Sequence, residues 1–177
     1  IGRLEVVNIT QHRQLAQAQG IRAVPWLRLG PFELAGLRAP AELAQWAARA
    51  HSSEGMAEYL RELLMEGGLS GVRAVLQRAP QHTAAALVHL LGDAEAALQV
   101  RVGVAAVVEE LEGSALLTAQ VDRLGALTHH ADARIRIDAA HSLGLSHAAN
   151  ARPFLNALLQ DDDAEVREVA QESLRAL

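Results

Sequence analysis

Residues 132–144 read DARIRIDAAHSLG, and the spacing of this stretch recurs 31 residues further along the chain. In both copies an aspartate is followed by an arginine, an alanine and a leucine at helical spacing, and two leucines precede the aspartate. The matching positions are Leu124, Leu127, Asp132, Arg136, Ala139 and Leu143 in the first copy and Leu155, Leu158, Asp163, Arg167, Ala170 and Leu174 in the second. Matches at one offset throughout indicate an internal repeat, each copy of which contains two helices.

Helical periodicity extends outward from this repeat over residues 53–177, without a convincing strand. An earlier copy fits with a slightly longer turn between its helices, at Leu87, Leu90, Leu91, Arg101, Val104, Ala105 and Val108. Residues 56–65 and 69–79 predict a further apolar helix pair around Gly67 and Gly68, but this pair lacks the aspartate and the arginine. Two helices in each period of about 30–47 residues predict a helical solenoid.

The repeated polar residues have structural roles in this interpretation. Asp132 and Asp163 precede the second helix of their copies, where a carboxylate accepts hydrogen bonds from free amides and stabilises the helix by about 1 kcal/mol. Arg136 and Arg167 follow one turn later and are expected to pair with that aspartate and with the neighbouring copy. The small alanines let the helices approach closely, and the leucines fill a shared core.

The stretch from Asp132 resembles the second helix of HEAT-like repeats of the PBS-lyase type, as does the stretch from Asp163. The resemblance covers residues 82–177 well and residues 53–79 more weakly. It implies a right-handed solenoid whose concave face carries Arg101, Arg136 and Arg167. We therefore take these three arginines as candidate partner-binding residues.

The first fifty residues differ in charge and in pattern. They carry six arginines against three acidic residues, whereas residues 51–177 carry ten arginines against eighteen acidic residues. Their pattern predicts the order strand, helix, strand, strand, helix, at residues 4–9, 11–19, 26–29, 32–37 and 41–50. We expect Gly20 to end the first helix, Gly30 and Pro31 to form a turn, and Gly36 to interrupt the last strand. The side chains expected to face inward from the two helices are Leu15, Ala16, Leu43, Trp46 and Ala47.

Residues 20–25 read GIRAVP, and with the following hairpin and helix they resemble the C-terminal half of a thioredoxin. In that family the proline that matches Pro25 follows a cis peptide bond, faces the redox-active cysteine pair, and lies where extended substrates pair with the backbone. The resemblance implies that Val24, Pro25 and Trp26 contact a partner. Two features depart from the family: Trp26 replaces the usual threonine, and the first strand, helix and strand, with the cysteine-bearing helix, are absent.

This absence affects the predicted sheet. In a thioredoxin the strand matching residues 4–9 does not pair with the strand matching residues 26–29, because another strand lies between them. The two strands would therefore flank a gap that leaves backbone groups unpaired. Three explanations remain open: the missing half lies upstream in a longer chain, the sheet is rearranged, or two copies form a homodimer by exchanging strands.

Composition excludes several classes of function. The 177 residues include no cysteine, so this chain can form neither a disulfide, a thiolate metal site nor a thiol nucleophile. The net charge of −5 has the wrong sign for nucleic-acid binding through a basic face. No apolar run reaches the roughly 20 residues of a membrane span. The eight histidines show no metal-ligand spacing, and we expect no catalytic residue, metal or cofactor in this chain.

We therefore predict an α+β protein in which a thioredoxin-like β-α-β-β-α half-domain, residues 1–50, packs on an all-α HEAT-like solenoid, residues 51–177. The predicted function is non-catalytic protein binding, as an adaptor or as a chaperone-like scaffold for polypeptides, without nucleic acid or membrane. The alternative is the substrate-selecting part of a thiol–disulfide oxidoreductase whose cysteine pair lies upstream. A third hypothesis is a structural module of a larger assembly. The expected compartment is the cytoplasm, for which the lack of a signal peptide gives no evidence.

Overall fold

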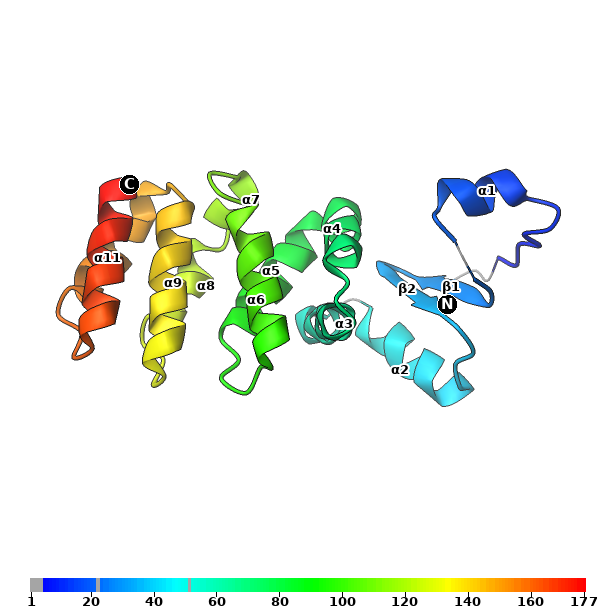
Figure 1. The fold of residues 1–177 in the computed structure, drawn as a ribbon, viewed down its shortest axis with the longest axis horizontal. Helices are drawn as coiled ribbons and strands as arrows, with labels where there is room; N and C mark the ends of the chain where they lie inside the picture. The colour runs from blue at the N-terminus through cyan, green and yellow to red at the C-terminus, as the bar shows by residue number, and fades with distance from the viewer. Residues whose placement is uncertain (1–4, 22, 51) are drawn as a thin grey trace. The chain divides into compact units, whose positions relative to one another are not determined.

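The computed structural model describes residues 5–21, 23–50 and 52–177 (Figure 1). The protein is mostly helical, and the described residues contain one two-stranded antiparallel sheet, which places the protein in the α+β class. The chain divides into two compact units, residues 1–50 and residues 51–177. They are called unit 1 and unit 2 below, and each is described by itself.

Unit 1 contains two helices and a hairpin. Its elements are α1 (Arg13–Ala18), β1 (Trp26–Leu29), β2 (Phe32–Ala35) and α2 (Pro40–Arg49). The strands pair antiparallel, with Trp26 opposite Ala35 and Leu29 opposite Phe32, so the predicted hairpin is confirmed. Gly30 makes the turn between them at φ +55°, a conformation that glycine adopts without steric cost. The peptide bond between Val24 and Pro25 is cis.

The core of unit 1 is small and aromatic. Phe32, Leu34 and Trp46 are almost fully buried, and the rings of Phe32 and Trp46 meet edge to face with centroids 5.2 Å apart. The inward position of Trp46 on α2 is thus confirmed. Leu43 is only half-buried, and Ala47 is exposed, so the predicted inward position of Ala47 is wrong. Trp46 is the side chain of α2 that is buried in this core, against Phe32.

The strand predicted over residues 4–9 is not formed in the described part of this segment. Residues 5–9 belong to no β-ladder, the side chain of Val6 is 85% exposed, and Leu4 lies outside the described residues. The Asn8 side chain accepts hydrogen bonds from the amide and hydroxyl of Thr10, which turns the chain towards α1. A β-branched run becomes a strand only beside a partner strand, and no described residue pairs with this one.

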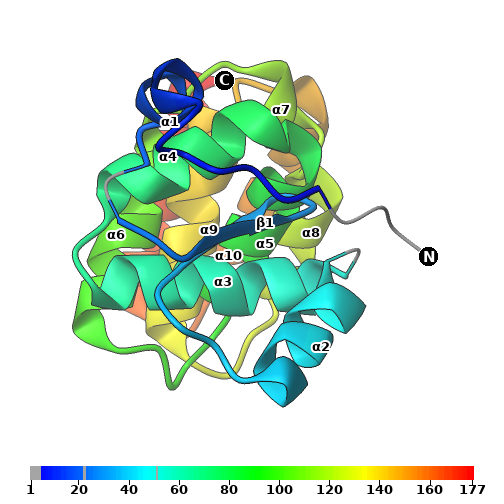
Figure 2. The same ribbon diagram turned by 90° about the vertical axis from the view of Figure 1, so that its right-hand side faces the viewer.

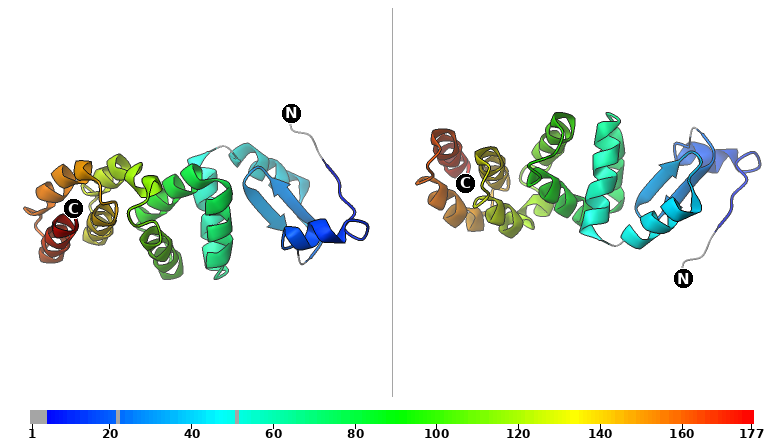
Figure 3. Two further views of the ribbon diagram at one scale, coloured as in Figure 1. Left: turned by 90° about the horizontal axis from the view of Figure 1, so that it is seen from above. Right: turned by 90° about the horizontal axis from the view of Figure 1, so that it is seen from below.

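Unit 2 consists of helices, and its described residues contain no strand. They are α3 (Ser53–Met65), α4 (Leu69–Arg78), α5 (Pro80–Leu91), α6 (Leu98–Glu109), α7 (Ala115–Thr118), α8 (Val121–Leu127), α9 (Ala133–Leu145), the 3₁₀ turn η1 (Ala149–Ala151), α10 (Arg152–Leu158) and α11 (Ala164–Ala176). Within this unit α9 packs against α11 on one side and α6 on the other, while α8 and α10 cover α9 and α11 from behind (Figures 1 and 3). Figure 2 looks along this row, so successive helices overlap.

The two copies of the repeat share two kinds of polar contact: an aspartate that caps the second helix, and an arginine that donates to the turn before it. Asp132 and Asp163 cap α9 and α11, each accepting from the backbone amide two residues on at 2.9 Å, which confirms the predicted caps. Arg136 donates to the carbonyl oxygens of His130 and Ala131 at 2.8 and 3.1 Å. Arg167 donates in the same way to the carbonyl oxygens at positions 161 and 162, at 2.6 and 3.0 Å. These contacts satisfy carbonyl oxygens of the turns that precede α9 and α11.

Arg136 also links its copy to the next one. Its Nε and Nη2 atoms donate to the two carboxylate oxygens of Asp161 at 2.8 and 2.7 Å, and the side chains are only 15% and 10% exposed. The hydrogen bond from Arg136 lowers the pKa of Asp161, and the same bond raises that of Arg136. The predicted pairing with the neighbouring copy is therefore confirmed. The predicted pairing of Arg136 with Asp132 of its own copy is wrong. The ion pair with Asp132 is formed instead by Arg134, at 3.1 Å.

The apolar repeat positions are buried as predicted except at Leu127 and Leu174, which are half-exposed. Ala139, Ala170 and Leu143 are fully buried, whereas Leu174 is half-exposed on α11. Gly144, which is also on α9, allows a close approach, since an added Cβ would lie 2.8 Å from the Cβ of Ser173. The interface between α9 and α11 is therefore built from small side chains.

We expect Arg136→Met to lower the free energy of unfolding of unit 2 by about 3 kcal/mol, because it leaves the mostly buried Asp161 carboxylate without its cation. Arg167→Met is the matched control, since Arg167 makes the carbonyl contacts but forms no ion pair with a described residue, and its cost should be clearly smaller. Urea denaturation followed by far-ultraviolet circular dichroism measures both. Equal costs for the two variants would contradict a linking role for Arg136.

His147 gives the fold a dependence on pH. Its Nδ1 lies 3.1 Å from the carbonyl oxygen of Ala176 and its Nε2 lies 3.0 Å from a Glu112 carboxylate oxygen. Only the imidazolium donates from both nitrogens, so the bond to Ala176 and then the bond to Glu112 raise the pKa of His147 above 6.5. Because folding raises this pKa, the stabilisation is complete at pH values below the pKa of His147 in the unfolded chain. It is lost as the pH rises through the pKa of His147 in the folded protein.

We therefore expect the melting temperature of the natural protein to exceed that of His147→Asn by more at pH 5.5 than at pH 9. Asparagine suits this position because the backbone there has φ +49°. Differential scanning calorimetry across this range measures the difference. A difference that is the same at every pH would show that His147 does not stabilise the fold through its charge.

Candidate functional site

A groove of about 680 Å³ lies beside the hairpin of unit 1. Its walls come from the unpaired segment 5–9, from α1 with the turn that follows it, and from β1 with the two residues before it. The groove is lined by Glu5, Val6, Val7, Ile9, Leu15, Ala16, Gln19, Ile21, Val24, Pro25, Trp26, Leu27, Arg28 and Leu29. Most of these side chains are apolar. The sequence placed Leu15 in the core, but it is 43% exposed and lines this groove.

One edge of β1 faces the groove without a partner. The amide of Gly36 donates to the carbonyl oxygen of Pro25 at 2.8 Å. This bond fixes which residues of β1 point their backbone groups towards β2, since these residues alternate with ones that point away. By that alternation Leu27 and Leu29 direct their backbone groups towards β2, and Trp26 and Arg28 direct theirs away from it. Among the described residues β1 pairs with β2 alone. The backbone amide and carbonyl of Trp26 and Arg28 therefore form an open edge.

The three candidate residues of unit 1 lie together at the start of this edge. Val24 is 59% exposed, Pro25 is exposed and Trp26 is half-buried. The Arg28 guanidinium lies 5.2 Å from the centroid of the Trp26 ring and donates to Glu33 at 2.8 Å. The ring of Trp26 is thus held beside the open edge and available to an incoming group.

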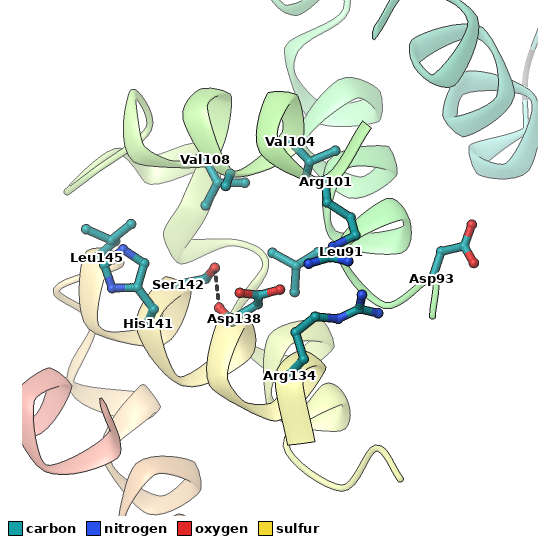
Figure 4. A pocket seen from close by; sticks show the side chains of 11 residues that line it. Leu91, Asp93, Arg101, Val104, Val108, Arg134, Asp138, His141, Ser142 and Leu145 are labelled. Carbon is teal, nitrogen blue, oxygen red and sulfur yellow. Dashed lines mark hydrogen bonds between the residues drawn. The ribbon is translucent and has the colours of Figure 1, made fainter. Parts of the chain in front are cut away.

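The three candidate arginines of unit 2 have different surroundings. The side chains of Arg136 and Arg167 are engaged in the turn contacts described above. Arg101, on α6, makes no such contact; it lines a cleft of about 40 Å³ between α6 and α9 (Figure 4). The structure therefore does not bring the three arginines into one site.

The cleft contains charged residues that the sequence analysis did not select. Its lining residues are Leu91, Asp93, Arg101, Val104, Ala105, Val108, Arg134, Asp138, His141, Ser142 and Leu145. Arg134, Asp138 and His141 are spaced i, i+4, i+7 on α9, which places them on one face of the helix. This spacing is visible in the sequence, but it matches no metal-ligand motif and so did not mark these residues as a candidate site.

Burial raises the pKa of the Asp138 carboxyl above its usual range, and the charges of Arg101, Arg134 and His141 act against this shift. The described residues contain no group of three or more histidine, aspartate or glutamate side chains arranged to hold a metal ion. In the same residues no helix has the length and apolar character needed to cross a bilayer.

A comparison with models of known protein families gave no match, and a search of curated proteins found no significant relative.

The two tryptophans of the chain both lie in unit 1, so their fluorescence reports on that unit alone. We expect Trp46→Ala to destabilise unit 1 by about 3 kcal/mol or more, because it removes a buried ring from a small core. Trp26→Ala removes a half-exposed ring beside the groove and should cost less than 1 kcal/mol. Denaturant titration, followed by the remaining tryptophan in each variant, measures both. Equal destabilisation would show that Trp26 belongs to the core.

Proposed function

We propose that this protein binds extended polypeptide segments, as an adaptor or a chaperone-like scaffold, and that a segment adds to the open edge of β1. The observation that carries the proposal is the open edge itself, which lies in a large and mainly apolar groove. An unpaired strand edge accepts another strand through main-chain hydrogen bonds, and neighbouring pockets accept alternate side chains.

The surroundings of the edge support a polypeptide as the ligand. Val24 and Trp26 provide apolar contacts where an added strand would begin, and Val6 and Leu15 provide the opposite wall. Backbone N–H and C=O groups on Trp26 and Arg28 need both acceptors and donors in alternation, which a peptide backbone offers and a small apolar molecule does not. The excess of arginine over acidic residues in residues 1–50 would favour a segment with acidic flanks.

The finer architecture belongs to the same proposal. We infer that unit 1 is a thioredoxin-like half-domain, which is supported by its hairpin, closing helix and cis bond before Pro25. We infer that unit 2 is a HEAT-like solenoid, which is supported by the polar contacts repeated at an offset of 31 residues. In this interpretation the groove occupies the place of the strand missing from the sheet.

Amide hydrogen exchange tests the site directly. The probe is a permanently unfolded, carboxymethylated globular protein, which presents many extended segments. We expect its addition to slow the exchange of the Trp26 and Arg28 amides, which face the open edge. The Leu27 and Leu29 amides, which already bond to β2, should change much less. Binding that leaves the Trp26 and Arg28 amides unprotected would contradict strand addition.

A matched pair of variants at Arg28 separates the backbone from the side chain. Arg28→Pro removes an edge-facing amide without removing a bond to β2, so it should weaken binding about tenfold or more, equivalent to about 1.4 kcal/mol. Arg28→Ala keeps the amide and should bind within about twofold of the natural protein. The fluorescence of buried Trp46 checks that both variants are folded. Equal affinities for the two variants would overturn the proposal.

A further inference from the structure

We propose that an extended segment bound in the groove of unit 1 pairs with both walls at once, with β1 on one side and with residues 5–9 on the other. The inference rests on the proposed function, because it concerns the same groove and the same class of ligand. It goes beyond that function in two respects: it gives residues 5–9 a role in binding, and it restricts what the bound segment can be.

Residues 5–9 present an unpaired backbone. The carbonyl oxygen of Asn8 accepts from the amides of Gln11 and His12, both at 3.1 Å, which anchors the end of the segment at the turn before α1. Among the described residues, the backbone groups of residues 5–7 have no hydrogen-bond partner, and the side chains of these residues are exposed. Their amides and carbonyl oxygens are therefore available to an added strand.

The segment lies across the groove from β1. Val6 and Val7 line the groove together with all four residues of β1, and Figures 2 and 3 show residues 5–9 running beside the hairpin. A strand inserted between two others separates them by about 10 Å, since neighbouring strands lie about 4.8 Å apart. Two strand-like walls that line one groove of about 680 Å³ therefore suit a single inserted strand.

The composition of the segment favours an extended conformation. Val6, Val7 and Ile9 are β-branched, and residues of this kind favour a strand when a neighbouring strand is present to pack against. In the structure described here that neighbour is missing, and the segment forms no strand. A bound segment would supply the neighbour, so residues 5–9 would become a strand on binding.

Pairing on both sides restricts the backbone of the ligand. The amides of successive residues in a strand point to opposite sides, so pairing with one edge uses every second amide and pairing with two edges uses them all. Proline has no amide hydrogen and is then excluded at every position of the bound segment.

The groove also selects the side chains of the ligand. Leu27 and Leu29 line it on the face of the hairpin that carries the buried Phe32 and Leu34, and Trp26 lines it on the other face. A strand in this position meets apolar groups on both faces, as a central strand of a sheet does. The ligand is therefore a short run of β-branched residues that contains no proline.

A scan of N-methylated peptides tests the pairing. The probe is a heptapeptide with blocked ends, in which three valines alternate with two threonines between terminal glutamates. We expect methylation of any one of its five central amides to weaken binding about tenfold or more, because each amide donates to one of the two walls.

The other results of the scan have distinct meanings. Weakening at alternate positions only would overturn pairing with residues 5–9 and leave strand addition to β1 intact. Binding that is indifferent to methylation would overturn both proposals. If the unfolded protein binds and the unmodified heptapeptide does not, the inferred class of ligand is wrong.

Hydrogen exchange gives an independent readout on the protein. Saturating heptapeptide should slow exchange of the Val6 or the Val7 amide about tenfold or more, since adjacent amides of a strand face opposite sides. Amides within α2 are the control and should change little. Protection of the Trp26 and Arg28 amides without protection of either valine amide would contradict a second paired wall.

Matched variants of the two valines complete the test. At least one of Val6→Pro and Val7→Pro removes an amide directed at the ligand and should weaken heptapeptide binding about tenfold or more. Val6→Thr and Val7→Thr keep the amide and the β-branched shape, and both should bind within about twofold of the natural protein. The fluorescence of buried Trp46 checks folding. If neither proline variant binds more weakly than its threonine counterpart, residues 5–9 do not pair with the ligand.

Discussion

The Arg136 guanidinium forms the contact on which the arrangement of α9 and α11 depends. It joins two carbonyl oxygens of the turn before its own helix to the Asp161 carboxylate of the next turn. Because the Arg136 and Asp161 side chains are mostly removed from water, each would be left with neither its partner nor full solvation if the other moved. The ion pair therefore fixes the register of one helix pair on the next, and the small residues Ala139, Gly144 and Ala170 permit the close packing that it requires.

The polar groups that lack a hydrogen-bond partner are of different kinds in the two units: side-chain groups in unit 2 and backbone groups in unit 1. In unit 2 the arginines of the two later copies bond to carbonyl oxygens of the turns before their helices, whereas among the described residues the Nε atoms of Arg101 and Arg134 are buried without a hydrogen-bond partner. In unit 1 it is the backbone of β1 that remains unpaired, since the strand predicted over residues 4–9 does not join the sheet. The groove of unit 1 is therefore a place where the regular pattern of a sheet is broken, and where backbone hydrogen-bonding groups are open to a ligand.

Much of the fold follows from local signals. The caps at Asp132 and Asp163, the turn at Gly30 and the inward position of Trp46 depend on contacts within a few residues, and the sequence predicts them correctly. The candidate sites follow less completely. Val24 and Trp26 do lie on the groove, but Arg134 and Asp138 became recognisable only when α6 was placed against α9. A charged side chain on a helix indicates a site only when the neighbouring helix removes it from water.

The sequence by itself determined the helix pairs of unit 2, the offset of the repeat and the hairpin of unit 1, because periodicity, capping and turn chemistry act along the chain. Only the tertiary structure decided that residues 5–9 stay out of the sheet and that Arg136 pairs with Asp161 and not with Asp132. It also decided that the Arg101 Nε is buried without a hydrogen-bond partner. The physical reason is common to these cases: strand pairing and ion pairing need a second group brought near from elsewhere in the fold, and a local pattern does not specify that group.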